Sequence, residues 1–186
     1  MKIISFFLIC LMLSQSAFSQ KRKVIKEKKV KSKTEWVYKS DKDTLPRKEL
    51  IQEYNKDGYT TLKIDYNKES NIKLKETAKY DRYGNVIEES FYTAKENQEI
   101  KYMYKYNAKN DMVEKEDYID DILQNKTTYK YNAAGNVVLE TIFDDQGNLF
   151  RNISFTYNSK NLKELKRVTD VDGNVISIKK YYYEYH

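Results

Sequence analysis

One short phrase recurs along this chain at an almost constant interval: a tyrosine, then Asn or Asp, then a turn sequence. Its copies are Tyr54-Asn55, Tyr80-Asp81, Tyr106-Asn107, Tyr131-Asn132 and Tyr157-Asn158. Successive tyrosines are 26, 26, 25 and 26 residues apart. A fixed period of this size is typical of repeat proteins, in which each unit packs on its neighbours. We therefore expect most residues to build a scaffold.

Each period divides into two halves, because further turn sequences lie between the copies of the phrase. Weaker polar turns at residues 69–71, 95–97, 109–111, 120–121 and 160–161 fill the places without a Gly-Asn or Asp-Gly pair. A turn every 12 or 13 residues predicts strands joined as consecutive antiparallel hairpins. The residues predicted to form the strongest turns are Gly58, Gly84, Asn85, Gly135, Asn136, Gly147, Asn148, Gly173 and Asn174.

The segments between the turns alternate as strands do. In residues 100–106, Ile100, Tyr102, Tyr104 and Tyr106 fall on one face, because successive side chains of a strand point to opposite sides. The chain has 18 Tyr, a strong strand former, and a single Pro, Pro46. The sequence therefore predicts an all-β fold: a repetitive meander of antiparallel β-hairpins in an elongated, twisted sheet, open or partly curled.

The repeated phrase resembles the YD repeat of Rhs-type proteins, whose pattern is Tyr-x-Tyr-Asp-x-x-Gly followed by Arg or Asn. The matching segments are residues 80–86, 104–107 and 129–137. The resemblance covers about residues 53–186, roughly five units, and implies the strand-turn unit rather than toxin delivery. Asn replaces Asp in most copies, the units are too few to wind a large closed shell, and no toxin domain follows them.

The first residues have the pattern of a secretory signal peptide. Lys2 precedes the apolar run of residues 3–13, and Ala17 and Ser19 are the small residues of a cleavage site before Gln20. We therefore expect residues 1–19 to be removed on export, to the periplasm, the cell surface or the medium. The only Cys, Cys10, lies inside this segment, so the mature chain has no disulfide.

Residues 20–33 form a basic segment, and residues 34–52 form an atypical capping hairpin ahead of the repeats at 53–186. The range 21–33 holds eight Lys or Arg and one acidic residue, Glu27, whereas the rest of the mature chain is close to neutral. Such a run is usually a solvated tether. Contact with anionic envelope polymers or lipid head groups is the alternative. Export makes nucleic acid an unlikely partner, and we expect no membrane span.

The sequence has few of the residues that enzymes commonly use for catalysis. His186 is the only His, and no Cys remains after export, which argues against nucleophilic triads and the usual zinc sites. The paired carboxylates at 88–89, 120–121 and 144–145 are expected at turns or on strand surfaces. Residues 170–174 resemble the start of a calcium loop, but lack its later ligands and match a hairpin turn. We expect no enzyme activity, no metal and no cofactor.

The aromatic ladders are the best candidates for binding. Tyrosine offers a rigid apolar body and a hydroxyl, which suits stacking on sugars or anchoring a protein. Most of these rings are equally suited to packing across strands. The predicted function is a non-catalytic interaction or scaffold module of the cell envelope; the alternative is binding of an envelope polysaccharide. The candidate binding residues are Tyr102, Tyr104, Tyr106, Tyr129, Tyr131, Tyr181, Tyr183 and Tyr185.

Overall fold

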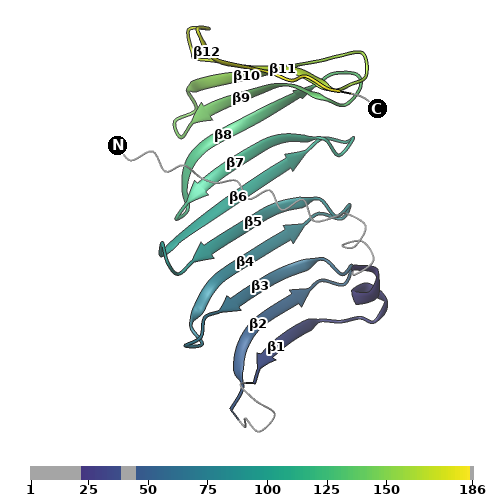
Figure 1. The fold of residues 1–186 in the computed structure, drawn as a ribbon, viewed down its shortest axis with the longest axis vertical. Coiled ribbons are helices and arrows are strands. Elements are labelled where there is room, and N and C mark those ends of the chain that lie inside the picture. Colours follow the sequence, from purple (N-terminus) through teal and green to yellow (C-terminus); the bar gives the residue numbers. More distant parts are fainter. Residues whose placement is uncertain (1–21, 39–44, 185–186) are drawn as a thin grey trace.

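The computed structural model describes residues 22–38 and 45–184, which form one antiparallel sheet of 12 strands (Figure 1). The order of the strands in the sheet is their order in the chain. The predicted all-β hairpin meander is therefore confirmed, and the sheet is open, with β1 and β12 at its edges. The strands are β1 Ser32–Val37, β2 Arg47–Tyr54, β3 Thr60–Tyr66, β4 Ile72–Tyr80, β5 Val86–Thr93, β6 Gln98–Tyr106, β7 Met112–Ile119, β8 Ile122–Tyr131, β9 Val137–Asp144, β10 Leu149–Tyr157, β11 Lys163–Thr169 and β12 Val175–Lys180.

The sheet is a single twisted layer, and no second layer of described residues covers either face (Figure 1). Few of the described residues are therefore buried, and no large side chain among them is completely so: the buried hydrophobic residues are Tyr54, Ile153 and Phe155, and the buried polar ones are Ser90 and Thr127. Such a sheet is held together by its backbone ladder and by pairs of side chains on neighbouring strands.

One turn geometry, with Asn or Asp at its first position, closes most of the hairpins. At Asn132, the side-chain Oδ1 accepts the backbone N–H groups of Ala134 and Asn136, both at 3.0 Å. The side chain thus provides a hydrogen-bond acceptor for two backbone N–H groups of the turn. Asn and Asp are therefore favoured at this position. The turns of this kind begin at Asn55, Asn67, Asp81, Asn107, Asn132, Asp144, Asn158 and Asp170.

The fourth residue of each such turn has a positive φ. Glycine adopts this conformation without strain, and the structure places Gly58, Gly84, Gly135, Gly147 and Gly173 there. Asn85, Asn136, Asn148 and Asn174 come next and donate their N–H groups back to the first side chain. In the weaker turns this position holds Ser70, Asn110 or Asn161, whose φ values are 64°, 64° and 59°.

Part of the basic segment is folded, which differs from the expected solvated tether over 20–33. Residues 22–27 form a short helix, and Ser32 begins β1. The Lys26 Nζ lies 2.8 Å from Asp57 Oδ1, and the Arg22 guanidinium lies 4.4 Å from the centre of the Tyr59 ring. These contacts with the first repeat turn hold the segment and could not be foreseen from its charge. The predicted signal peptide at 1–19 lies outside the described residues.

Candidate functional site

Five of the predicted binding tyrosines lie on the same side of the sheet, called the tyrosine face below. Tyr102, Tyr104 and Tyr106 alternate along β6, and Tyr129 and Tyr131 end β8. Strand pairing sets carboxylates among them, because residues paired across an antiparallel ladder share a face. Tyr102 is paired with Glu89 and Asp117, and Tyr129 is paired with Glu140.

The rings at the centre of the tyrosine face are held by their neighbours. The Tyr104 hydroxyl donates a hydrogen bond to the Glu89 carboxylate. Tyr102 packs edge-on against Phe91, with ring centres 6.1 Å apart. The Lys115 Nζ lies 4.0 Å from the centre of the Tyr102 ring and 2.7 Å from Asp117 Oδ1. An ammonium held by a carboxylate over a ring combines an ion pair with a cation–π contact.

Partial burial changes the acidity of groups on this face. Burial raises the pKa of Tyr104, and its hydrogen bond to Glu89 raises that pKa further. Burial, with the nearby Glu140 charge, raises the pKa of Tyr129 to about 12. Burial also raises the pKa of the Glu140 carboxyl, against the opposing effect of Lys166 and Lys163. The Tyr104 and Tyr129 phenols therefore stay neutral at physiological pH, and burial disfavours the charged form of Glu140.

The hydroxyls of three predicted binding tyrosines serve the scaffold. Tyr106 donates to the Val86 carbonyl at 2.8 Å, Tyr131 to the Met112 carbonyl at 2.6 Å, and Tyr183 to the Lys163 carbonyl at 2.7 Å. Each bond joins the end of a hairpin's second strand to the start of its first strand. Tyr80 and Tyr157 make the same bond to Thr60 and Val137. Sequence reasoning did not assign Tyr80 and Tyr157 this role, although the 26-residue spacing of the tyrosines indicates it.

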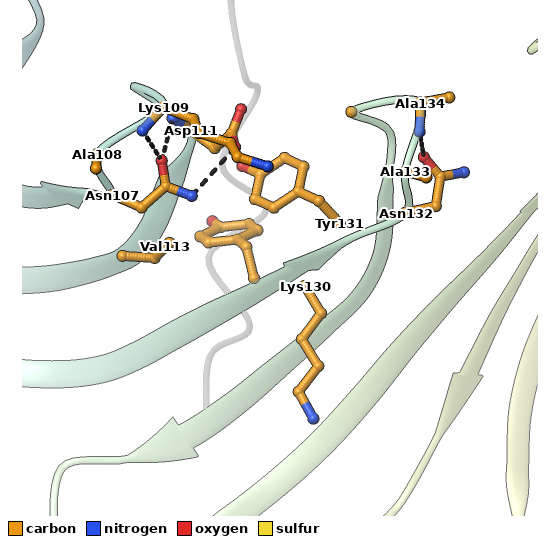
Figure 2. Close-up of a pocket in the computed structure, with 12 residues that line it drawn as sticks. Asn107, Ala108, Lys109, Asp111, Val113, Lys130, Tyr131, Asn132, Ala133 and Ala134 are labelled. Atoms are coloured by element: carbon orange, nitrogen blue, oxygen red, sulfur yellow. Dashed lines mark hydrogen bonds between the residues drawn. The ribbon is translucent and has the colours of Figure 1, made fainter.

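An open hollow of about 860 Å³ lies between the adjacent turns that begin at Asn107 and Asn132. Figure 2 shows the Asn107 side chain, whose Oδ1 accepts the backbone N–H groups of Lys109 and Asp111, with the Tyr131 ring beside it. Tyr129 and Val113 complete the apolar part of the lining. The hollow thus extends the tyrosine face to the ends of the strands, where the Tyr-Asn turns lie. It offers amide, carboxylate and ammonium groups beside the rings of Tyr129 and Tyr131.

The other predicted binding tyrosines lie after β12. Tyr181 is partly buried, with the Lys179 Nζ 5.4 Å from its ring centre. Tyr183 is 40% exposed and its hydroxyl is used by the scaffold bond to Lys163. Tyr182, which the sequence did not single out, is 86% exposed. Tyr185 lies outside the described residues. The C-terminal tyrosines are therefore separate from the cluster on β6 and β8.

The part of the chain that the structure describes shows no arrangement of side chains typical of a metal site. No group of three or more His, Cys, Asp and Glu side chains is placed to hold an ion there. In the turn at 170–174, Asp170 Oδ1 accepts the N–H groups of Asp172 and Asn174, at 3.0 and 2.8 Å. Its other oxygen accepts the Asn174 side-chain amide. The helices in the described ranges are all too short or too polar to cross a membrane.

Comparison with known proteins gives distant likenesses only. No family model matches the chain, and no curated protein does. A chain of the TcdB2-TccC3-Cdc42 structure matches 82% of this chain with 9% identity and a TM-score of 0.44. A porin-like protein from Bacteroides uniformis also matches 82%, with 18% identity and a TM-score of 0.36. This chain spans 10% of the first protein and 49% of the second. The resemblance to the YD repeat therefore stays a prediction from the residues.

Proposed function

We propose that this chain is an exported, non-catalytic interaction module of the cell envelope, with the tyrosine face as its partner surface. The observation that carries the proposal is a sheet face that presents ordered aromatic rings without a covering layer of described residues. A domain that needed this face only for stability would bury it against a second layer.

A protein partner suits the chemistry of the face. Tyrosine rings are among the commonest energetic anchors of interfaces, because they bury a large area with little loss of rotamer freedom. The contacts of Tyr102 with Phe91 and Lys115 already fix its ring, which lowers the entropic cost of binding further. Glu89, Asp117 and Glu140 add hydrogen-bond acceptors, while Lys115 offsets the charge of Asp117, and Lys166 and Lys163 lie near Glu140. The face therefore favours a partner that presents hydrogen-bond-donating side chains.

The non-catalytic part of the proposal rests on the residue inventory. The only Cys and the only His are Cys10 and His186, at the two ends of the chain. The carboxylates of the tyrosine face have assigned neighbours: Glu89 accepts from Tyr104, and Asp117 is paired with Lys115. Burial raises the pKa of Glu140, which lies opposite Tyr129, and a carboxyl group in this position suits ligand contact as well as packing.

The proposal is tested by crosslinked capture from an envelope extract, followed by mass spectrometry and sugar analysis. Tyr102→Ser removes a ring from the tyrosine face, and Met103→Ser is the matched control, since Met103 is the next residue of β6 and points to the other face. We expect a stoichiometric protein that is retained by the wild type and by Met103→Ser but not by Tyr102→Ser. Equal capture by all three would exclude the tyrosine face.

An envelope polysaccharide is the second candidate, and the pairing of rings with carboxylates favours it. Sugar rings stack on aromatic side chains while their hydroxyls donate to carboxylates. Tyr129 opposite Glu140, beside the hollow between the Asn107 and Asn132 turns, provides both. Retention on envelope polysaccharide that falls at least tenfold in Tyr129→Ala, with no protein partner captured, would favour this candidate over the first.

The basic segment supplies the proposed contact with an anionic envelope surface. Lys28, Lys29 and Lys31 are exposed, whereas Lys26 is already paired with Asp57. Each lysine beside an anionic surface contributes about 1 kcal/mol. Replacing the three exposed lysines by Gln should weaken binding to vesicles that contain anionic lipid, with no change in the thermal stability of the sheet. Unchanged binding would exclude this role.

A further inference from the structure

The Tyr-Asn turns form a row at one end of the strands, and side chains join some neighbours in this row (Figure 1). Asn85, the fifth residue of its turn, donates from Nδ2 to Oδ1 of Asn110, the fourth residue of the next turn, at 3.2 Å. Asn136 and Asn161 make the same contact at 3.5 Å. The residues at the fifth and fourth positions therefore decide whether two neighbouring turns are joined.

The first two turns of the row contact each other in a different way. Tyr59 is the fifth residue of its turn, and Gly84 is the fourth residue of the next turn. The Tyr59 side chain covers this glycine, because a Cβ added to Gly84 would lie 2.0 Å from the Tyr59 hydroxyl oxygen. The Tyr59 ring also stacks on Tyr80, with ring centres 4.7 Å apart. Here a ring from the fifth position occupies the space that an Asn at the fourth position fills elsewhere.

The turns 107–111 and 132–136 have neither kind of contact. Their fifth and fourth positions hold Asp111 and Gly135, and a Cβ added to Gly135 would meet no atom within 4 Å. No hydrogen bond joins these two turns in the part of the chain that the structure describes. The hollow of about 860 Å³ lies between them (Figure 2). It is therefore the place where the row lacks the side chain that joins other neighbouring turns.

The hollow offers a hydrogen-bond acceptor beside a fixed ring. Asp111 Oδ2 accepts from Asn107 Nδ2 at 3.1 Å, and Asp111 Oδ1 accepts no hydrogen bond from a described residue. Burial raises the pKa of Tyr131 and the Asp111 charge raises it further, so this carboxylate acts on the ring that lines the hollow. The Tyr131 hydroxyl donates to the Met112 carbonyl, which fixes the ring. A donor that enters the hollow can therefore bond to Asp111 while its apolar part packs on Tyr131.

Charge at the hollow favours a neutral donor over a cation. The turn 107–111 carries one basic and one acidic side chain, Lys109 and Asp111, and the turn 132–136 carries no charge. Lys130 also lines the hollow, with its ammonium group directed away from the two turns in Figure 2. A Lys or Arg side chain would meet repulsion from these lysines as well as attraction to Asp111, whereas an amide can donate to the carboxylate without that repulsion.

We propose that the hollow receives an Asn or Gln side chain of the protein partner, in the place that Asn110 and Asn161 fill in neighbouring pairs of turns. Those two residues show that an amide side chain fits between adjacent turns of this sheet. The Asp111 carboxylate only accepts hydrogen bonds, so the incoming amide donates its N–H to it. The inference rests on the proposed protein partner and names one side chain by which that partner is recognised.

Filling the hollow from within the chain tests the proposal. Gly135→Asn supplies the amide that Asn110 and Asn161 provide in their turns, at a φ that Asn adopts there. Gly147→Asn is the matched control. Gly147 has the same place in a Gly-Asn turn, a φ of 85° against 79° at Gly135, and no atom within 4 Å of an added Cβ, but it lies at the opposite ends of the strands. Circular dichroism should show both variants folded, with similar melting temperatures.

Crosslinked capture from an envelope extract measures the effect of each variant. We expect the wild type and Gly147→Asn to retain the same protein, and Gly135→Asn to retain at least tenfold less of it. Equal retention by Gly135→Asn would overturn this inference and leave the proposed function intact, whereas a wild type that captures no protein would overturn both. Capture of a polysaccharide alone, lost in Gly135→Asn, would show that the hollow holds a sugar and would overturn a protein side chain as its occupant.

Asp111→Asn tests the acceptor. The variant keeps the size of the side chain and an oxygen for Asn107, but it removes the charge that strengthens the hydrogen bond to an incoming amide. We expect about fivefold weaker capture. In the captured partner, Ala at the Asn or Gln that enters the hollow should weaken binding to the wild type and have no further effect on Gly135→Asn. Unchanged capture by Asp111→Asn, or a partner that tolerates Ala at every Asn and Gln of its contact surface, would overturn the inference.

Discussion

The hydroxyl of Tyr106, at the end of β6, donates to the carbonyl of Val86, at the start of β5, over 2.8 Å. The two residues lie on the two paired strands of one hairpin, at its open end, and are 20 positions apart. Tyr80 makes the same bond one unit earlier, and Tyr131, Tyr157 and Tyr183 make it in the three units that follow. The recurring tyrosine therefore ties together the open ends of the two strands of each hairpin, in a sheet that lacks a second layer in its described part.

Removal of this hydroxyl should destabilise the sheet. Tyr106→Phe keeps the ring and leaves the Val86 carbonyl without its partner, so the free energy of unfolding should fall by about 1 kcal/mol. Tyr182→Phe is the matched control, because Tyr182 is 86% exposed. Urea denaturation followed by tryptophan fluorescence or circular dichroism measures both. Equal stability of Tyr106→Phe and the wild type would mean that the hydroxyl bond does not stabilise the hairpin.

The turn position with positive φ should respond oppositely to two substitutions. At Ser70 the φ is 64°, so Ser70→Gly removes strain and should stabilise the protein by about 0.5 kcal/mol. At Gly135 the φ is 79° and an added Cβ meets no atom within 4 Å, so Gly135→Ala isolates the backbone term. It should destabilise by about 1 kcal/mol. Thermal melts that move in the same direction for both variants would contradict this account of the turns.

Glu140 should make stability depend on pH. Its folded-state pKa lies above the ordinary value of 4.5, because burial penalises the charged form. The penalty is absent below the unfolded-state pKa and grows as pH rises from there through the folded-state pKa. Glu140→Gln should therefore raise the midpoint of thermal unfolding at pH 7 and change it little near pH 3.5. A variant that is less stable than the wild type at pH 7 would show that Glu140 is stabilising as a carboxylate.

The ion pair between Lys115 and Asp117, beside the Tyr102 ring, should show a measurable coupling free energy. The Lys115 and Asp117 side chains are each 25% exposed, so their pair is less screened than an open surface pair. A double-mutant cycle with Lys115→Met and Asp117→Asn should give a coupling free energy of about 1 kcal/mol. Additive single losses would mean that the contact contributes nothing beyond the two separate side chains.

The sheet and its turns were predictable because their causes are local. An Asn or Asp that caps its own turn and a Gly at positive φ both leave a mark within five residues, as at 132–136. The alternation of Tyr with Lys in 100–106 similarly marks one strand and its two faces.

The roles of individual tyrosines were less predictable, because they depend on neighbours far along the chain. Tyr104 and Tyr106 lie on the same face of one strand, yet one hydroxyl donates to Glu89 and the other to the Val86 carbonyl. The short helix at 22–27 is held by Tyr59 and Asp57, contacts that no local pattern reveals. Glu140 had no distinguishing sequence signal, since only strand pairing sets it opposite Tyr129.

Photocrosslinking at two adjacent positions of β6 tests the central claim most directly. A benzoylphenylalanine at position 102 lies on the tyrosine face, and one at position 103 lies on the other face. We predict that, in intact cells, position 102 crosslinks to a single envelope partner and position 103 does not. Crosslinks from position 103 alone, or none from either position, would contradict the assignment of the tyrosine face as the binding surface.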